Sequence, residues 1–480
     1  MQDARTQRLL AQLRSSGPLP ARTLARDLGV SQPTMSRLLA AAGDRVLRIG
    51  RARATRYALA RDIGRAGHRW PLYRIGPDAR PTLLGELRAL AGEGFHFAPE
   101  RSLPSFLAGD FADGLLPGLP WFLDDQRPQG FLGRGFVRRV AADIGAPDDL
   151  LRWRADDVLL GLLRHGHDQP GDLVVGEQAL QEALRLTLSA DDALAPGERD
   201  AHYPRQAEAA LRGDAVGSSA AGEQPKFLAT LREPGGLRSL IVKFSERTDV
   251  PAGRRWGDLL HCERIASDIL SAHGIAAAHS EVLEADGRVF LESTRFDRTP
   301  VRGRRGFVSL AAIDAAFHGH GRIDWWRYAA QLERDGWMNA ADARRLCVLG
   351  WFGALIGNSD MHLGNAGLLL ADARPLALAP AYDMLPMMFR PATSGEVVER
   401  EFQVTPPLPE QLAEWTEAAG AAVAFWAAVT DCMDISTPFR GIAGRAGRAL
   451  ARAVAIHAGG KPTAAPTGPD SRRRPGSRHR

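Results

Sequence analysis

Apolar residues recur every three or four positions through most of the last third of the chain. This spacing is found at 327–334, 340–356, 409–430 and 442–457, and it places the apolar side chains of each segment on one face of a helix. We therefore predict a largely helical C-terminal part. Nearer the N-terminus, the pattern of 70–90 predicts a strand followed by a helix.

A shorter pattern interrupts the helical one. Two apolar runs, 366–370 and 376–381, flank five residues with turn character, which predicts a β-hairpin. Asp360 and Asn365 precede the hairpin, and Asp383 follows it. Because a hairpin returns the chain to its starting point, we predict that these three polar side chains converge.

This set of polar residues is typical of a phosphotransferase. Asp360 would orient or deprotonate the acceptor hydroxyl, and Asn365 with Asp383 would hold Mg²⁺ against the phosphates of ATP. His362 and Tyr382, which stand beside them, are candidates for the same ATP site. The alternative is that all are ordinary turn residues, which Asp and Asn often are, but turn chemistry does not explain their clustering between apolar strands.

A run of small residues at 217–226 precedes a predicted strand at 227–231. Small residues let backbone N–H groups approach phosphate oxygens closely, so this loop is a candidate phosphate clamp. It is not a Walker loop, because no Gly-Lys-Ser/Thr ends it. Taken alone, the run is equally typical of a flexible turn. Its candidate ATP-binding residues are Ser219, Gly222, Gln224 and Lys226.

The next strand, 240–244, contains a lysine, Lys243, among apolar and β-branched residues. Lysine is poorly suited to a buried strand, which favours a role as a phosphate ligand. Glu263 follows in a segment with helical spacing, and protein kinases hold such a lysine with a helix glutamate. The alternatives are a lysine on a solvated strand face and a surface glutamate.

The first 62 residues have the pattern of a winged helix-turn-helix. Helical spacing at 6–13, 21–28 and 32–42, the last capped by Ser31, is followed by an arginine-rich hairpin at 45–59. Residues 1–75 hold 15 arginines and four aspartates, a net charge of +11, although the whole chain carries only +5. We predict that this module binds duplex DNA, while a protein-contact role remains open.

The candidate DNA contacts fall into two groups. Polar residues of the third helix would meet base edges, and arginines of the hairpin would meet phosphates or the minor groove. The first group is Gln32, Thr34, Ser36 and Arg37, and the second is Arg48, Arg51, Arg53 and Arg56.

Four motifs between residues 70 and 455 resemble those of HipA-type serine/threonine kinases, the toxin components of bacterial toxin–antitoxin systems. The fused N-terminal module is similar to the YjjJ branch of that family. The motifs are Ser219-x-x-Gly222-x-Gln224-x-Lys226, Arg295-Phe296-Asp297-Arg298, Gly357-Asn358-x-Asp360-x-His362-x-x-Asn365 and Tyr382-Asp383-x-x-Pro386.

The resemblance implies an α+β, two-lobed kinase-like fold with a mostly helical C-lobe. It implies that Asp360 is the catalytic base, that Lys243 contacts the phosphates, and that adenine binds near Thr294 and Phe296. It further implies autophosphorylation at Ser219 or its neighbour Ser218. Known members modify aminoacyl-tRNA synthetases, so the resemblance implies a protein substrate of that kind and an antitoxin partner.

We expect four segments: the DNA-binding module at 1–62, an N-lobe with a family-specific subdomain at 70–295, a C-lobe at 296–457 and a disordered basic tail at 458–480. Asp124 and Asp125, within an aromatic-rich stretch, are expected in a solvated turn. Cys262, Cys347 and Cys432 are widely spaced, which predicts reduced cysteines without a disulfide or zinc site.

The chain has no apolar run of about twenty residues and its start lacks an apolar signal core, so we expect a cytoplasmic protein without membrane spans. Three functions remain open. The intact set of Lys243, Asp360, Asn365 and Asp383 favours an active protein kinase. The alternatives are a transcriptional regulator whose kinase-like body senses nucleotide, and a small-molecule kinase of the aminoglycoside phosphotransferase type.

Overall fold

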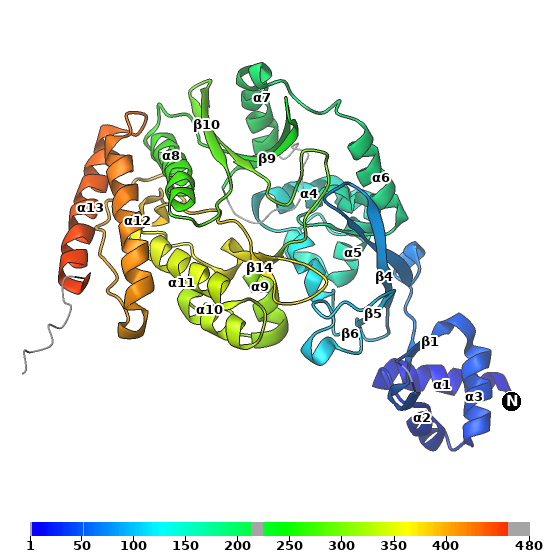
Figure 1. Cartoon of the computed structure of the whole chain (residues 1–480). Helices are drawn as coiled ribbons and strands as arrows, with labels where there is room; N and C mark the ends of the chain where they lie inside the picture. The colour runs from blue at the N-terminus through cyan, green and yellow to red at the C-terminus, as the bar shows by residue number, and fades with distance from the viewer. Residues whose placement is uncertain (1, 51, 213–223, 459–480) are drawn as a thin grey trace, which may run out of the picture.

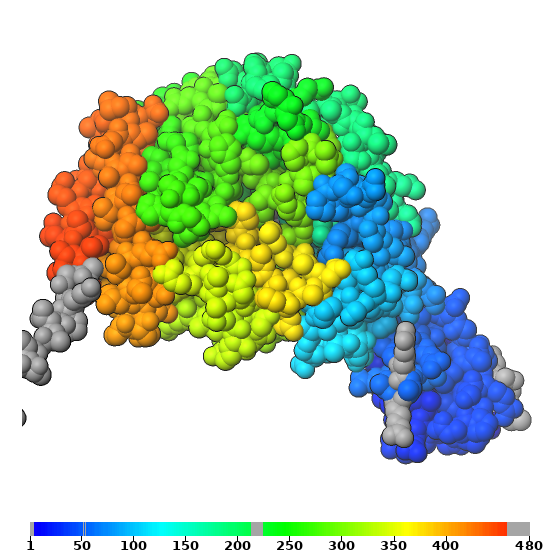
Figure 2. Space-filling view, viewed as in Figure 1, coloured from blue at the N-terminus to red at the C-terminus, as the bar shows by residue number. Residues whose placement is uncertain are grey.

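The computed structural model of the chain describes residues 2–50, 52–212 and 224–458. The N-terminal helices lie at one end of the molecule and α12 and α13 at the opposite end (Figure 1). In the space-filling view the N-terminal helices and the hairpin that follows them form a lobe that projects from the rest (Figure 2). Among the described residues, no helix has the length and apolar character that a membrane span requires.

The N-terminal lobe consists of three helices and a hairpin, in the order expected. They are α1 (Gln2–Ser16), α2 (Ala21–Asp27), α3 (Gln32–Ala42), β1 (Val46–Ile49) and β2 (Arg56–Leu59). Ser31 caps α3 as predicted, since its Oγ accepts a hydrogen bond from the Thr34 N–H at 3.4 Å. A small core of Leu9, Leu13, Leu24, Met35 and Leu38 holds the helices together. The assignment as a winged helix stays a prediction.

A five-stranded antiparallel sheet follows, with the strand order β6-β5-β4-β3-β7. Its strands are β3 (Arg69–Ile75), β4 (Pro81–Ala89), β5 (Phe95–Pro99), β6 (Leu115–Leu116) and β7 (Leu173–Val175). The helix predicted within 70–90 is wrong, because this segment is β4. It pairs with β3 on one side and β5 on the other, so tertiary pairing overrides the local pattern. The helices α5 (Ala155–His165) and α6 (Glu177–Leu188) contact this sheet, and α4 (Gly130–Ile144) packs against α5.

A second antiparallel sheet has the strand order β10-β11-β9-β8. Its strands are β8 (Lys226–Glu233), β9 (Gly236–Phe244), β10 (Ser280–Ala285) and β11 (Arg288–Thr294). On one face, Tyr203 of α7 (Arg199–Arg212) packs against Phe227 and Phe290. On the other face, Leu260 of α8 (Pro251–Ala272) packs against Leu291. Lys226 of β8 stands directly opposite Lys243 of β9, so both lysines share the α8 side.

The C-terminal part is mostly helical, as predicted. Its helices are α9 (Leu310–Ile313), α10 (Trp325–Arg334), α11 (Ala340–Leu355), α12 (Leu412–Asp431) and α13 (Thr437–Ala458). The predicted hairpin is present but its strands are shorter than expected, namely β13 (Gly367–Leu369) and β14 (Ala377–Leu378). A third strand, β12 (Val308–Ser309), pairs with β13. Buried tryptophans, including Trp351 and Trp426, fill the core between these helices.

Candidate active site

Lys243 of β9 lies at the centre of a buried charge cluster. Its Nζ is 2.6 Å from Oε1 of Glu263 on α8, and it also donates to Oδ1 of Asp383. Burial by itself lowers the pKa of Lys243, but the two carboxylates outweigh this effect and raise it overall. The same lysine, with Lys226, holds the pKa of Asp383 below its usual range despite burial. At neutral pH the cluster therefore contains a charged lysine and an ionised Asp383.

The loop between α11 and β13 is folded by hydrogen bonds among its own polar residues. Asn358 Oδ1 accepts from the Asp360 N–H at 3.1 Å, and Asn365 Nδ2 donates to the Asp360 carbonyl at 2.8 Å. His362 Nδ1 accepts from the Gly364 N–H at 3.0 Å. These bonds fix the backbone on both sides of the Asp360 side chain, which faces a cavity.

Asp383 is joined to this loop across the hairpin. Asn358 Nδ2 donates to the Asp383 carbonyl at 3.1 Å, and Tyr382 Oη donates to the Gly364 carbonyl at 2.8 Å. Asp383 itself has a φ of +55°, a left-handed conformation that Asp tolerates better than most residues but that is uncommon outside turns and functional sites. The hairpin thus brings Asp360, Asn365 and Asp383 to one place, as the sequence predicted.

A cavity of about 140 Å³ lies between the second sheet and the hairpin. Thr294 and Phe296 line it, and the Phe296 ring lies 5.8 Å from that of Tyr382, centre to centre. The hydroxyl of Thr294 is buried without a hydrogen-bond partner among the described residues. Ile241, Ala278 and Phe307 contribute further apolar surface to the wall. Flat apolar walls with a few polar groups suit a nucleotide base.

A second cavity, of about 670 Å³, opens beside the first and shares Gln129, Lys226, Asn365 and Asp383 with it. Asp360, His362 and Gln224 line only this larger cavity. The two cavities together form one cleft, with the apolar part at the Thr294 end and the polar part at the Asp360 end. A nucleotide requires such a division, because its base is largely apolar and its phosphate chain is charged.

The residues predicted to bind Mg²⁺ have suitable chemistry and position. Asn365 uses its Nδ2 on the Asp360 carbonyl, which leaves Oδ1 for a ligand, and Asp383 is ionised beside it. Carboxylate and amide oxygens are the protein ligands that Mg²⁺ takes, usually with phosphate oxygens and water. The oxygens at the polar end of the cleft therefore fit the ion.

Residues far upstream also line the cleft, and sequence reasoning missed them. Gln129 and Gly130, at the start of α4, border the larger cavity, and Asp125 borders the smaller one. The expectation that Asp125 lies in a solvated turn is wrong. Its Oδ2 accepts from the Ser309 N–H at 2.7 Å, and burial raises its pKa to about 6. A contact across 184 positions leaves no local signal.

The Arg295–Arg298 motif forms a buried network behind the cleft. Arg295 and Arg298 reach the Asp168 carboxylate at 2.9 and 2.8 Å, and both also bind Asp297. These ion pairs hold the chain that leaves β11 and carries Phe296. Arg295, Phe296 and Asp297 line the smaller cavity, whereas Arg298 does not, so the ion pairs stabilise this wall of the cleft.

Three predicted residues of the phosphate loop, Ser218, Ser219 and Gly222, lie outside the described residues, as does Arg51. Among the predicted DNA contacts, Gln32, Ser36 and Arg37 are exposed on α3, and Thr34 is half-buried. Arg48 and Arg56 are exposed on β1 and β2, and Arg53 lies in the turn between those strands. Of the expected tail at 458–480, all residues after Ala458 lie outside the described residues.

Two family descriptions match the chain: "YjjJ-like toxin, middle domain" at residues 66–184 and "HipA-like C-terminal domain" at residues 218–437. Toxin YjjJ of Escherichia coli (strain K12) is 38% identical over 435 residues, covering 90% of this chain and 95% of that protein. Putative kinase Y4dM of Sinorhizobium fredii is 31% identical over 220 residues, covering 40% of this chain and 50% of that protein.

A solved structure of the HipA, HipB and operator DNA complex of Shewanella oneidensis MR-1 contains a similar fold. The match has a TM-score of 0.51 at 15% identity and covers 81% of this chain and 97% of the other. The fold and the cleft thus define a HipA-like protein with kinase-type architecture. The identity over nearly the whole length shows more: the chain belongs to the family of YjjJ-like toxins.

Proposed function

We propose that the protein is an ATP- and Mg²⁺-dependent serine/threonine protein kinase of the HipA toxin type. The observation that carries this proposal is the contact of Lys243 with both Glu263 and Asp383. Asp360 and Asn365 line the same cleft. A lysine held by a helix glutamate beside a metal-binding aspartate is the arrangement that protein kinases use on ATP.

Each side chain has a role in this proposal. Thr294, Phe296 and Tyr382 border the site of the base, and Lys243 with Lys226 neutralises the phosphates. Asn365 and Asp383 would hold Mg²⁺, which would supply charge stabilisation to the transferring phosphoryl group. Asp360 accepts the proton of the acceptor hydroxyl. Gln224 and His362 line the polar end of the cleft, where they contact phosphate or acceptor.

The acceptor is a protein, and an aminoacyl-tRNA synthetase is the candidate that the family resemblance supports. We also propose autophosphorylation at Ser219, with Ser218 as the less favoured site. A phosphate there adds close to two negative charges, which repel the phosphates of ATP. Mass spectrometry of peptides spanning 217–226 after incubation with ATP tests this modification.

We further propose the segment roles expected from the sequence: DNA-binding module at 1–62, N-lobe at 70–295, C-lobe at 296–457 and basic tail at 458–480. The separate core of the N-terminal helices supports the first boundary. An antitoxin is a candidate partner, because the HipA of similar fold was solved with HipB and operator DNA.

The decisive experiment is phosphoryl transfer from labelled ATP in native protein, Asp360→Ala and Asp383→Ala. We expect each substitution to lower the rate at least ~10²-fold, since charge stabilisation in such sites has this effect. Lys243→Ala should weaken transfer severely. Transfer at the native rate in either aspartate variant would contradict the kinase assignment and leave nucleotide sensing as the function.

Asp372→Asn provides a matched control. Asp372 lies in the turn of the same hairpin, pairs with Arg74 and Arg101, and does not line the cleft. We expect this variant to retain transfer at close to the native rate.

A further inference from the structure

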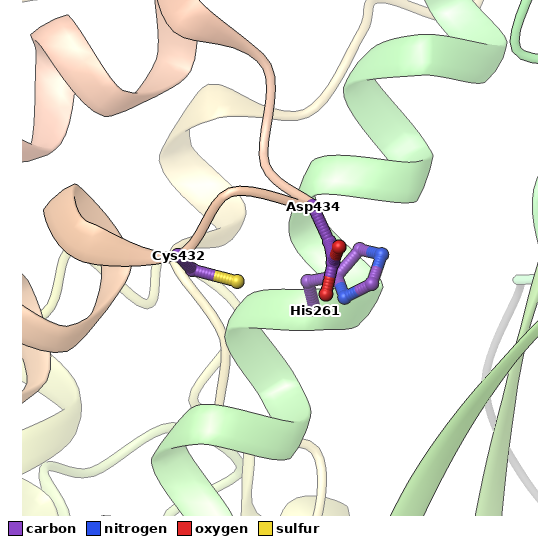
Figure 3. A group of neighbouring side chains, drawn as sticks. All are labelled: His261, Cys432 and Asp434. Atoms are coloured by element: carbon purple, nitrogen blue, oxygen red, sulfur yellow. The ribbon is translucent and has the colours of Figure 1, made fainter.

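Three side chains with metal-binding chemistry come together outside the active site. His261 is on α8, and Cys432 and Asp434 are in the turn that joins α12 to α13. One ligand atom from each lies within 4.8 Å of the other two. Figure 3 shows the Cys432 thiol and the Asp434 carboxylate extending from the turn toward His261 on the helix.

The imidazole of His261 is the buried member of this cluster, with only 4% of its surface exposed. Its Nε2 is buried without a hydrogen-bond partner among the described residues, and Oε1 of Glu284 lies 3.5 Å from it. The carboxylate of Glu284 thus faces one nitrogen of the ring, and carboxylates in this position orient the histidine ligands of protein zinc sites.

The turn that carries the other two ligands is already fixed to α8. Asp258, one helical turn before His261, accepts from both the N–H and the Oγ–H of Ser436, each at 2.7 Å. Asp258 is itself 4% exposed. Because this contact sets the distance between the turn and the helix, the three ligands are held near one another before any ion arrives.

We propose that His261, Cys432 and Asp434 form a zinc-binding site that fastens the α12–α13 turn to α8. Thiolate and imidazole favour zinc over Mg²⁺ or Ca²⁺, and the Cys432 thiol releases its proton to solvent when it binds. Glu284 lies outside this ligand set and accepts the imidazole N–H at Nε2, an arrangement common around protein zinc.

The geometry requires only small side-chain rotations. Zinc bonds of about 2.0–2.3 Å in a tetrahedral site place neighbouring ligand atoms somewhat closer together than the 4.8 Å limit observed. Cys432 is half-buried and Asp434 is exposed, so both side chains are free to turn inward onto the ring of His261. The cysteine spacing hid this site, because its ligands are 171 positions apart in sequence.

Cobalt titration of the chelator-treated full-length protein, with excess Mg²⁺ present, tests the proposal. Cobalt takes the same ligands as zinc and gives a thiolate-to-metal absorption band. We expect one equivalent of cobalt to produce this band and zinc to abolish it. No cysteine lines the described part of the active-site cleft, so cobalt bound near Asp383 gives no such band.

The variants separate this site from the others. We expect Cys432→Ser to lose the band and to bind zinc at least ~10²-fold more weakly, and Glu284→Gln to bind it roughly 10-fold more weakly. Cys347→Ser, which removes a buried thiol of α11, should keep both properties. Zinc should raise the melting temperature of native protein and Cys347→Ser but not of Cys432→Ser. A thiolate band that persists in Cys432→Ser, or native protein that binds no stoichiometric zinc, would overturn the proposal.

Discussion

At the scale of single residues, the sequence alone identifies four candidate site residues. Lys243 is a charged residue within an apolar strand, and Asp360, Asn365 and Asp383 stand beside a predicted hairpin. The structure brings them together around one cleft. Asp125 could not be selected, because its role depends on a contact with Ser309 that no local pattern encodes. The sequence thus shows the chemistry of a residue, but it does not show which residues distant in the chain contact it.

The substitution Glu263→Gln tests how much the helix carboxylate contributes to holding Lys243. The variant keeps the shape of the side chain but removes one of the two negative charges on the lysine. We expect phosphoryl transfer to fall by roughly 10- to 100-fold, since one positioning interaction in a catalytic site has about this effect. Asp268→Asn is the control, because Asp268 is on the same helix and pairs with Arg264 at the surface. Equal rates of phosphoryl transfer in the two variants would contradict the proposed role of Glu263.

His96 of β5 makes stability depend on pH. Burial lowers its pKa from 6.5 to about 4, so the unfolded chain binds a proton in this range more readily than the native protein does. Native stability should therefore fall as pH decreases from about 6.5 to 4, by at most about 3 kcal/mol from this group. Urea unfolding of His96→Gln should show a smaller loss over the same range. A native-to-variant difference that stays constant with pH would exclude this effect.

At the scale of elements, the spacing of apolar residues predicts the C-terminal helices and the β13–β14 hairpin, but it does not predict β4. Its apolar residues fit a helix nearly as well as a strand, and pairing with β3 and β5 decides between them. Helix α8 shows a second constraint that periodicity cannot reveal. It begins close to the loop after β9, and Gly253 is the residue that permits this approach.

Two helix glycines should respond in opposite ways to alanine. A Cβ at Gly253 of α8 would overlap the backbone carbonyl of Arg247, whereas a Cβ at Gly420 of α12 has nothing within 4 Å. We expect Gly253→Ala to destabilise the protein by about 1–3 kcal/mol and to reduce phosphoryl transfer by displacing α8. Gly420→Ala should stabilise it by about 0.5–1 kcal/mol. Chemical denaturation of both variants measures this, and the same sign for both would refute the packing argument.

For the whole molecule, the N-terminal lobe is attached to the body by more than a linker. Leu47, Ile49 and Ala58 of the hairpin form a buried cluster with Leu90, and Arg61 pairs with Asp156 of α5. The lobe is therefore best tested within the full chain, since an isolated fragment exposes this apolar contact. Its helices could be predicted from sequence, but its docking could not, because the contact needs both partners folded.

The full chain should bind duplex DNA with an affinity that falls steeply as salt rises. Each phosphate contact contributes about 0.9 to the slope of log affinity against log salt. We expect Arg48→Ala to weaken binding and to reduce this slope by about one unit. Arg445→Ala, which removes an exposed arginine of α13 at the opposite end, should change neither. Native protein that shows no binding at low salt would favour the protein-contact role.

The pairing of Lys226 with Lys243 has a consequence for how this chain tolerates insertions and deletions. The two strands meet in a two-residue turn between Glu233 and Gly236, about 24 Å along β8 from Lys226. Because successive strand residues point to opposite faces, a change of one residue in the turn length shifts the register and turns Lys226 from the cleft into the aromatic face. Substitutions in this turn should therefore be tolerated, whereas changes in its length should abolish ATP binding.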